Sequence, residues 1–118
     1  MSGDWARPVV HWEIESPDPE RLRAFYSELF NWDIGEGPIM SIPAGLGGPE
    51  PGPNGHIRAS NRTGVNLFVQ VRDLRESLDR AVTLGGKVLA EPFEPSPGAA
   101  TLAAIGDPDG NAVMLVQQ

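Results

Sequence analysis

The sequence predicts a small α+β domain in which one order of strands and helix occurs twice. Alternating apolar residues precede an aspartate-capped amphipathic helix at residues 8–31, and the same order returns at residues 64–90. Aligning Asp18 with Asp73 gives an offset of 55 residues, the length of one supersecondary unit. We therefore expect one domain over residues 1–118, with modules at about 8–60 and 64–118.

The first strand is expected over Pro8–Glu15. Alternation places His11 and Glu13 on one face, and Trp12 and Ile14 on the other. Because one face is apolar and the other polar, we expect the first to face a core and the second to carry any chemistry.

A helix follows the first strand. Asp18 can accept hydrogen bonds from the first helical amides, and Pro19 suits the first helical position. The apolar residues then follow helical spacing, at Leu22, Phe25, Tyr26, Leu29 and Phe30. This row is typical of a core face rather than a cofactor site. We expect the helix to end near Asn31 and a second strand to begin at Trp32–Ile34.

The rest of the first module is expected to consist of two strands and a long loop. The strands are predicted at Pro38–Pro43 and Gly55–Ala59. Between them, the glycine- and proline-rich Gly45–Asn54 is interpreted as a mobile loop at the mouth of a site or at a dimer edge. Ser60–Thr63 is the expected linker between modules.

The second module repeats this order. A strand is expected over Gly64–Val71, with Asn66 and Phe68 on one face. A helix capped by Asp73 follows, and Gly85–Gly86 supply its left-handed end. Further strands are expected at the ranges Lys87–Ala90, Ala99–Ile105 and Ala112–Gln117, with a loop at Glu91–Gly98 and a tight turn at Asp107–Asn111.

Composition limits the possible partners. The net charge is −7, with an isoelectric point near 4.6, so binding to nucleic acid or to an anionic membrane surface is not expected. The chain has no cysteine, which excludes disulfides and thiolate sites. No apolar stretch is long enough to span a membrane, and the N-terminus does not read as a signal peptide. We expect a cytoplasmic protein, and the excess of arginine over lysine suggests a bacterial one.

Several motifs, in this order, resemble the glyoxalase/bleomycin resistance protein/dioxygenase (vicinal oxygen chelate) superfamily. They cover nearly the whole chain: Pro8–Ile14, Asp18–Arg21, Phe25–Trp32, Val69–Asp73, Leu84–Val88 and Asp107–Asn111. The resemblance implies two βαβββ modules that form a cupped, partly closed mixed barrel, and it implies a homodimer. The cavity of such proteins holds a divalent metal or binds a small molecule.

The resemblance also implies which positions would hold the metal. The first is His11, and its counterpart in the second module is Asn66. The last strand of the second module offers Met114, where a glutamate is expected. The last strand of the first module offers His56 or Arg58, with the register open. A neutral amide and a thioether are poor ligands for such a metal, so we expect no metal cofactor. If one binds, His11 and His56 are the expected ligands.

Three hypotheses about function remain open. The leading one is a glyoxalase/bleomycin-resistance-like protein that binds a small molecule without the usual metal, with His11 and Glu13 as an acid–base pair. In it, the ligand-binding candidates are Asn66, Phe68, Met114 and Arg58. The second is a metal-dependent lyase or dioxygenase that uses His11 and His56. The third is a drug-sequestering module without catalysis, for which the negative charge favours a cationic ligand.

Overall fold

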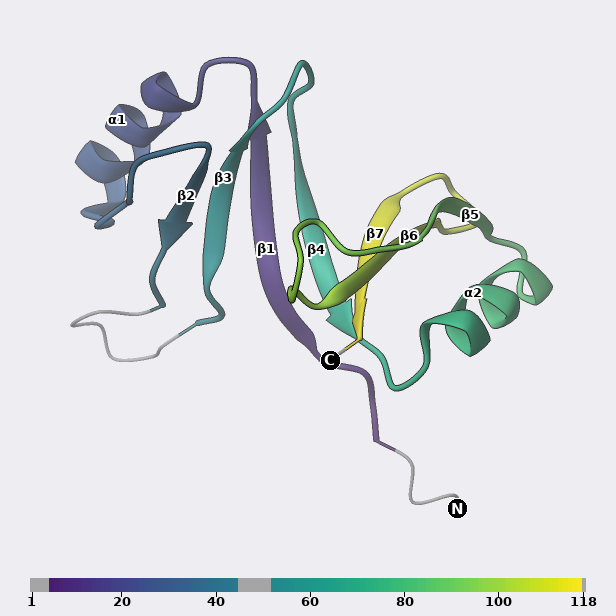
Figure 1. Ribbon diagram of the computed structural model, residues 1–118. Coiled ribbons are helices and arrows are strands. Elements are labelled where there is room, and N and C mark those ends of the chain that lie inside the picture. The colour runs from purple at the N-terminus through teal and green to yellow at the C-terminus, as the bar shows by residue number, and fades with distance from the viewer. Residues whose placement is uncertain (1–4, 45–51, 118) are drawn as a thin grey trace. The chain divides into compact units, whose positions relative to one another are not determined.

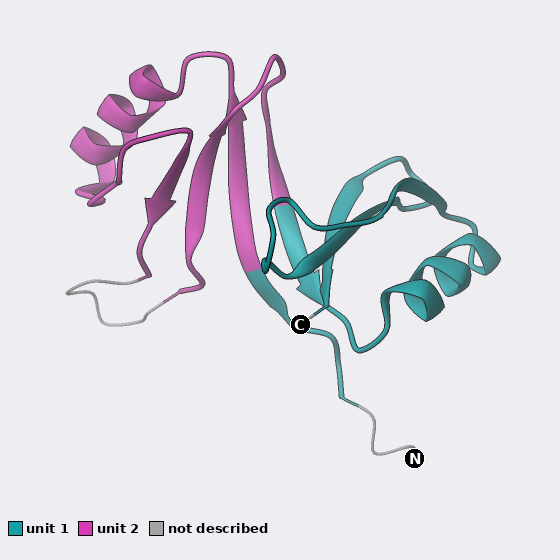
Figure 2. Ribbon diagram, viewed as in Figure 1, with its two compact units in different colours: residues 1–10, 67–118 teal, residues 11–66 magenta. Residues whose placement is uncertain are grey.

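The computed structural model describes residues 5–44 and 52–117 (Figure 1). These residues form seven strands and two helices, which fall into two compact units (Figure 2). One unit comprises residues 11–66, and the other comprises residues 1–10 and 67–118. Strands β1 (Val9–Ser16) and β4 (Gly64–Gln70) each contribute residues to both units.

The unit of residues 11–66 contains a mixed sheet. Strand β1 pairs in parallel with β3 (Gly55–Ala59), which pairs antiparallel with β2 (Ile39–Ile42). One sheet face carries the apolar core, made by Ile14, Ile34, Met40, Ile42 and Ile57. The predicted alternation of β1 is confirmed, because Ile14 lies in this core while Glu13 and Glu15 meet polar partners.

Helix α1 (Pro19–Phe30) begins and ends as predicted. The Asp18 side chain accepts a hydrogen bond from the backbone N–H of Arg21, and Asn31 ends the helix in a left-handed conformation with φ of 59°. Leu22 and Tyr26 pack against the core of this unit. Phe25, Leu29 and Phe30 are instead exposed, so the expectation that the whole apolar row forms a core face is only partly met.

The strand predicted at Trp32–Ile34 is wrong. These residues are extended but belong to no strand of the structure. The backbone carbonyl of Ile34 accepts a hydrogen bond from Arg23 Nε at 2.9 Å, and the backbone N–H of the next residue, Gly35, donates to the carbonyl of Ser41 in β2 at 3.0 Å. Ile34 itself is buried in the core, and Trp32 packs against Tyr26. Burial of these residues therefore explains why the sequence shows an apolar pattern like that of a strand, although they belong to no strand.

The other unit completes the second module. Strand β4 pairs in parallel with β7 (Ala112–Gln117), β7 pairs antiparallel with β6 (Thr101–Gly106), and β6 pairs with β5 (Lys87–Phe93). Helix α2 (Leu74–Thr83) is capped by Asp73, which accepts a hydrogen bond from the Glu76 backbone. Leu74 and Leu78 bury its apolar side in a core with Val71, Ala103 and Leu115.

The predicted turn before the last strand is confirmed. The Asp107 carboxylate accepts hydrogen bonds from the backbone N–H groups of Asp109 and Asn111 and from the Asn111 side chain. Strand β5 runs to Phe93, so the loop predicted at Glu91–Gly98 begins later than expected. Of the loop predicted at Gly45–Asn54, residues 45–51 lie outside the described residues.

The predicted α+β class is confirmed by these helices and by the parallel and antiparallel pairing in each unit. Neither of the two described helices is long and apolar enough to cross a membrane.

Candidate functional site

Strand register brings three predicted site residues together in the unit of residues 11–66. In the parallel pair of β1 and β3, Glu13 lies opposite His56. His11, two residues before Glu13, projects from the same face of β1. The side chain of His56 therefore lies between those of His11 and Glu13.

Hydrogen bonds join these three side chains in a row. His11 Nε2 lies 2.7 Å from His56 Nδ1, and His56 Nε2 lies 2.7 Å from Glu13 Oε2. The two imidazole planes are inclined by 30°, with ring centroids 5.0 Å apart. Both nitrogens of His56 are thus engaged in the row.

The hydrogen-bonding partners in this row determine which nitrogen of each imidazole carries a proton. An ionised carboxylate only accepts hydrogen bonds, so His56 Nε2 carries the proton that faces Glu13. In neutral His56, Nδ1 is then an acceptor, and the proton between the rings belongs to His11 Nε2. The lone pair of a neutral His11 is consequently on Nδ1. This Glu13–His56–His11 row is called the relay below.

Arg58 and Asn66 hold the carboxylate end of the relay. Arg58 Nε donates to Glu13 Oε2 at 3.1 Å, and Arg58 Nη2 donates to Glu15 Oε1 at 2.9 Å. The amide Nδ2 of Asn66 donates to both carboxylates, at 2.8 Å each. Because Glu13 and Glu15 are each only 4% exposed, these donors compensate two charges that burial would otherwise penalise.

The electrostatic balance keeps both carboxylates ionised. Burial alone would raise the pKa of Glu13, but hydrogen bonds from His56, Arg58 and Asn66 outweigh it and lower that pKa to about 2. The pKa of Glu15 is lowered as well, because hydrogen bonds from Asn66 and Ser60 outweigh its burial. Burial and the adjacent His56 lower the pKa of His11, against an opposing effect of Glu13. The lowered pKa favours the neutral form of His11 at pH 7, which is the form that can act as a base.

Two predicted ligand-binding residues lie in the other unit. Phe68 and Met114 are opposite one another in the pair of β4 and β7. Phe68 is buried and Met114 half-buried. The structure thus joins His11, Glu13, Arg58 and Asn66 in one network and places Phe68 beside Met114.

Glu15 and Arg62 join the network although we did not predict them as site residues. Arg62 Nη2 lies 3.4 Å from Glu15 Oε1. The signal for Glu15 was present in the sequence, because alternation from His11 and Glu13 continues to position 15 on the same face. No such signal existed for Arg62, which lies in the linker after β3.

A cavity of about 430 Å³ adjoins the relay. This size lies within the range of about 300–1,000 Å³ that small-molecule sites occupy. His11 and His56 line it from the sheet, and Ser41 and Asn54 add polar groups. The apolar part of its wall is formed by Ile39, Ile42 and Pro43. The cavity therefore combines an apolar wall with the histidine end of the relay.

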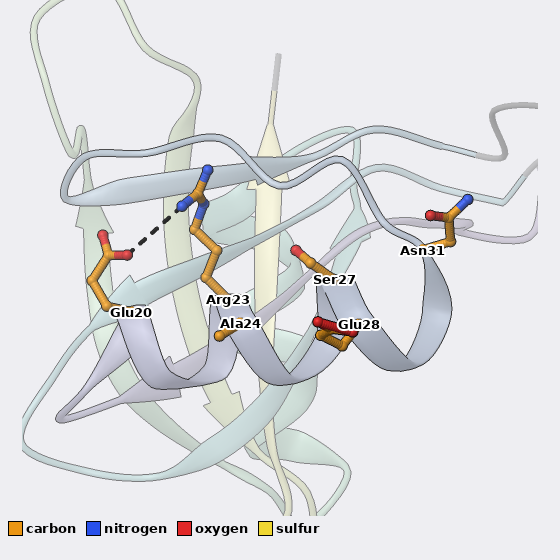
Figure 3. Close-up of a pocket in the computed structure, with 6 residues that line it drawn as sticks. All are labelled: Glu20, Arg23, Ala24, Ser27, Glu28 and Asn31. Atoms are coloured by element: carbon orange, nitrogen blue, oxygen red, sulfur yellow. Dashed lines mark ion pairs between the residues drawn. The ribbon is translucent and has the colours of Figure 1, made fainter.

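A second depression, of about 490 Å³, lies on α1 alone (Figure 3). It is lined by Glu20, Arg23, Ala24, Ser27, Glu28 and Asn31, of which Glu20 and Arg23 form an ion pair at 3.8 Å. Because one helix supplies all its lining residues and none of them is buried, we regard it as helix surface rather than a site.

A comparison with known protein families shows the family of this chain. A family model described as a glyoxalase-like domain matches residues 11–116. The chain belongs to the glyoxalase-like domain family. The match includes the relay, both helices and most of the final strand, so the predicted superfamily resemblance is confirmed.

Known proteins agree with the glyoxalase-like assignment. A glyoxylase-like domain-containing protein of Didymella fabae is 26% identical over 108 residues, which cover 84% of each chain. A glyoxalase/bleomycin resistance protein/dioxygenase superfamily member from Vibrio splendidus has a TM-score of 0.67 at 17% identity, covering 96% of this chain and 100% of its own. The Mn(II)-bound glyoxalase of Novosphingobium aromaticivorans has a TM-score of 0.65 at 12% identity, covering 97% of this chain and 40% of its own. At these identities the two structures support the fold alone.

The side chains at His11 do not match a divalent metal site as they are arranged. Two nitrogens bound to one tetrahedral zinc ion at about 2.0–2.1 Å stand about 3.3 Å apart, whereas His11 Nε2 and His56 Nδ1 stand at the 2.7 Å of a hydrogen bond. Glu13 accepts hydrogen bonds on both oxygens. Within residues 5–44 and 52–117, no three His, Asp or Glu side chains form a group suited to a metal ion.

Proposed function

We propose that this glyoxalase-like chain binds a small carbonyl compound in the 430 Å³ cavity and moves a proton on it without a divalent metal. The observation that carries the proposal is the relay, in which two contacts of 2.7 Å connect the cavity residue His11 to the buried carboxylate of Glu13. A base that is neutral at pH 7 and backed by a fixed negative charge suits proton transfer from carbon.

Each proton and electron pair in the proposed transfer has a defined donor and acceptor. His11 Nδ1 takes a proton from the carbon next to a carbonyl group, and the electrons of that C–H bond move to the carbonyl oxygen as an enolate. The proton on His11 Nε2 then shifts to His56 Nδ1. His56 becomes positively charged beside Glu13, and the reverse shifts return a proton to the carbon.

The buried charges support this assignment of roles. Glu13 stabilises a positive His56 because the two are in direct contact and little exposed, where Coulomb attraction is stronger than in water. Arg58 and Asn66 prevent Glu13 from taking the proton itself, since they favour its ionised form. In this proposal Glu13 is a positioning residue, whereas His11 is the catalytic base.

The test uses exchange of carbon-bound protons in deuterium oxide, followed by NMR. Acetone, hydroxyacetone and pyruvate are suitable probes, because each is small and has protons next to a carbonyl group. We expect exchange above the buffer rate for at least one probe, before and after dialysis against a chelator. His11→Ala should abolish it, and His56→Gln should reduce it by about 10²–10⁴-fold, the range for a positioned acid–base group.

Glu28→Gln is the matched control, because Glu28 is an exposed residue of α1 that does not line the cavity beside His11 (Figure 3). This variant should exchange protons at the wild-type rate. Buffer-rate exchange of all three probes, or full exchange by His11→Ala, would overturn the proposal. Exchange that disappears with the chelator and returns with Mn²⁺ or Zn²⁺ would overturn its metal-free form.

A further inference from the structure

We infer that the hydroxyl group of Ser41 donates the hydrogen bond that stabilises the negative oxygen formed during proton transfer in the cavity beside His11. Ser41 is then a second catalytic residue of this site. The inference rests on the proposed function for the reaction, but the position of Ser41 follows from strand pairing alone. Three observations support it: the sheet face on which Ser41 lies, the fixed backbone around it, and the hydrogen-bonding state of its hydroxyl.

Ser41 lies on the same sheet face as the relay. In the antiparallel pair of β2 and β3, Ser41 is opposite His56, and directly opposite residues of such a pair have their side chains on one face. Alternation along β2 agrees, because the neighbours Met40 and Ile42 are each 2% exposed and lie in the core on the other face. Ser41 also lines the same cavity as His56. Its side chain is therefore directed to the side on which the relay lies.

His56 lies between Ser41 and His11, because β3 is the middle strand of β2, β3 and β1. His56 Nδ1 is 2.7 Å from His11 Nε2, and Ser41 is one strand away on the other side, at the usual strand spacing of about 4.7–4.9 Å. A carbonyl compound that lies over His56 can thus present a C–H bond to His11 and its carbonyl oxygen to Ser41. Only the carbonyl carbon separates these two atoms of the compound, so the two side chains can act on one small ligand.

The backbone of Ser41 is fixed by its neighbours. All four residues of β2 pair with β3, and the backbone N–H of Gly35 donates to the carbonyl oxygen of Ser41 at 3.0 Å. A hydroxyl group on a backbone held in this way needs little reorganisation when charge develops on a bound molecule. Such preorganised donors contribute most to the stabilisation of a transition state.

The Ser41 hydroxyl is the polar group of the cavity best placed for this role. Ser41 is exposed, and no hydrogen bond to another described residue occupies its side-chain oxygen. Both ring nitrogens of His56 are engaged in the relay. Asn54, the remaining polar side chain of the described lining, precedes β3 and lies outside the strand pairing that fixes Ser41. A serine hydroxyl both donates and accepts hydrogen bonds, so this role sets no limit on the charge of the ligand before the reaction.

The proposed proton transfer needs such a donor. When His11 takes a proton from carbon, the electrons of the C–H bond form the new carbon–carbon double bond, and the electrons of the carbonyl double bond move to its oxygen. That oxygen becomes negatively charged, and a hydrogen bond to a charged acceptor is stronger than one to a neutral carbonyl. Ser41 therefore stabilises the transition state more than the bound substrate, which lowers the barrier. The hydroxyl group keeps its own proton throughout.

Exchange of carbon-bound protons by Ser41→Ala tests the catalytic role. We expect kcat for exchange to fall by about 10²-fold, as for one lost oxyanion donor. KM should change by less than about twofold, because the lost interaction is made mainly in the transition state. Ser41→Thr keeps the hydroxyl on a residue that suits a strand, and it should restore most of the exchange.

Ser27→Ala makes the same change on α1, outside the lining of the cavity beside His11 (Figure 3). This control should exchange protons at the wild-type rate. An unchanged kcat in Ser41→Ala would overturn the inference, as would a loss in Ser41→Thr as large as that in Ser41→Ala.

Binding of an enolate analogue tests the same residue without turnover. Propane-2-nitronate carries its negative charge on oxygen, as an enolate does, whereas 2-methyl-2-nitropropane is a neutral nitro compound with no proton to lose. Each is titrated into the ¹⁵N-labelled protein, and the backbone amide signal of His56 is followed. We expect Ser41→Ala to bind the nitronate at least about tenfold more weakly than the wild type, as for a lost hydrogen bond to a charged group, with little change for the nitro compound. Equal nitronate affinities of the two proteins would overturn the inference.

The two proposals fail in different ways. If Ser41→Ala weakens nitronate binding but the wild type exchanges no carbon-bound proton, the proton-transfer proposal is wrong and Ser41 stands as the donor to a negative oxygen. If the wild type exchanges protons and Ser41→Ala does so at the same rate, the role of Ser41 is wrong and the relay stands.

Discussion

His56 lies between His11 and Glu13, with one ring nitrogen 2.7 Å from each. The parallel register of β1 and β3, which sets Glu13 opposite His56, produces this arrangement. A carboxylate with a low pKa thereby determines the proton positions of two imidazoles. The predictions below follow from the contacts that hold this row in place.

The relay predicts how stability depends on pH. The pKa of Glu13 is about 2 in the folded protein against an ordinary value of 4.5, so the unfolded chain binds a proton first as pH falls. Ionised Glu13 therefore adds on the order of 3 kcal/mol to the free energy of unfolding above pH 4.5, and this contribution is lost as pH falls from 4.5 to about 2. Urea unfolding at several pH values measures it. A free energy of unfolding that rises over this range as pH falls would contradict the assignment.

Glu13→Gln should remove most of that pH dependence. Glutamine has nearly the same shape but no charge, and its NH₂ group would face the donors of His56 or of Arg58 and Asn66. We expect a lower free energy of unfolding at pH 7, by roughly 3 kcal/mol as for other broken buried ion pairs. We also expect a flatter profile below pH 4.5. A variant as stable as the wild type at pH 7 would show that the buried carboxylate is not stabilised by its partners.

Substitution by lysine should lower the free energy of unfolding more at Arg58 than at Arg62. Arg58 contacts both Glu13 and Glu15, and a lysine ammonium cannot reproduce the planar guanidinium across two carboxylates. Because the Arg58 side chain is 39% exposed, solvent screening limits the loss for Arg58→Lys to about 1 kcal/mol. Arg62 is 73% exposed, so Arg62→Lys should change stability by less than about 0.5 kcal/mol. Equal losses, measured by urea unfolding, would not fit this account.

Gly55 should tolerate no side chain. A Cβ there would stand 2.3 Å from the Trp12 indole, so Gly55→Ala must displace the ring or the strand, at a cost of about 1–3 kcal/mol. Gly52→Ala is the matched control, because no atom of the described residues lies within 4 Å of its added Cβ. Thermal unfolding of both variants checks the contrast. A Gly55→Ala protein with the melting temperature of the wild type would refute this packing.

Much of the fold could be predicted from the sequence, because its signals are local. The caps at Asp18 and Asp73, the left-handed end at Gly85 and the turn at Asp107 depend on side chains within a few residues of one another. The prediction of a strand at Trp32–Ile34 was wrong because strand pairing depends on residues far away in the sequence. Its apolar residues signal burial, but burial alone does not make a strand: in the structure residues 32–34 belong to no strand, and the Ile34 carbonyl accepts its hydrogen bond from the Arg23 side chain.

Several residues of the candidate site could be named from the sequence, but their arrangement could not. Alternation along β1 identified His11 and Glu13, but the position of His56 between them depends on the register of a strand more than 40 residues away. The contacts of Asn66 could not be predicted for a similar reason. It was considered as a weak metal ligand, whereas in the structure its amide bridges Glu13 and Glu15. Alternation along a strand determines which face a side chain takes, but it does not name the residue of a distant strand that will lie opposite it.

The most direct test of the relay is the tautomeric state of the two histidines, which are the only ones in the chain. Long-range ¹H–¹⁵N spectra of the imidazole rings at pH 7, assigned with His56→Gln, report which nitrogen of each ring carries the proton. The relay predicts a proton on Nε2 of both rings, and titration of His11 with a pKa below 6.5. A proton on Nδ1 of His56, or rapid averaging between tautomers in both rings with His11 titrating at 6.5 or above, would contradict it.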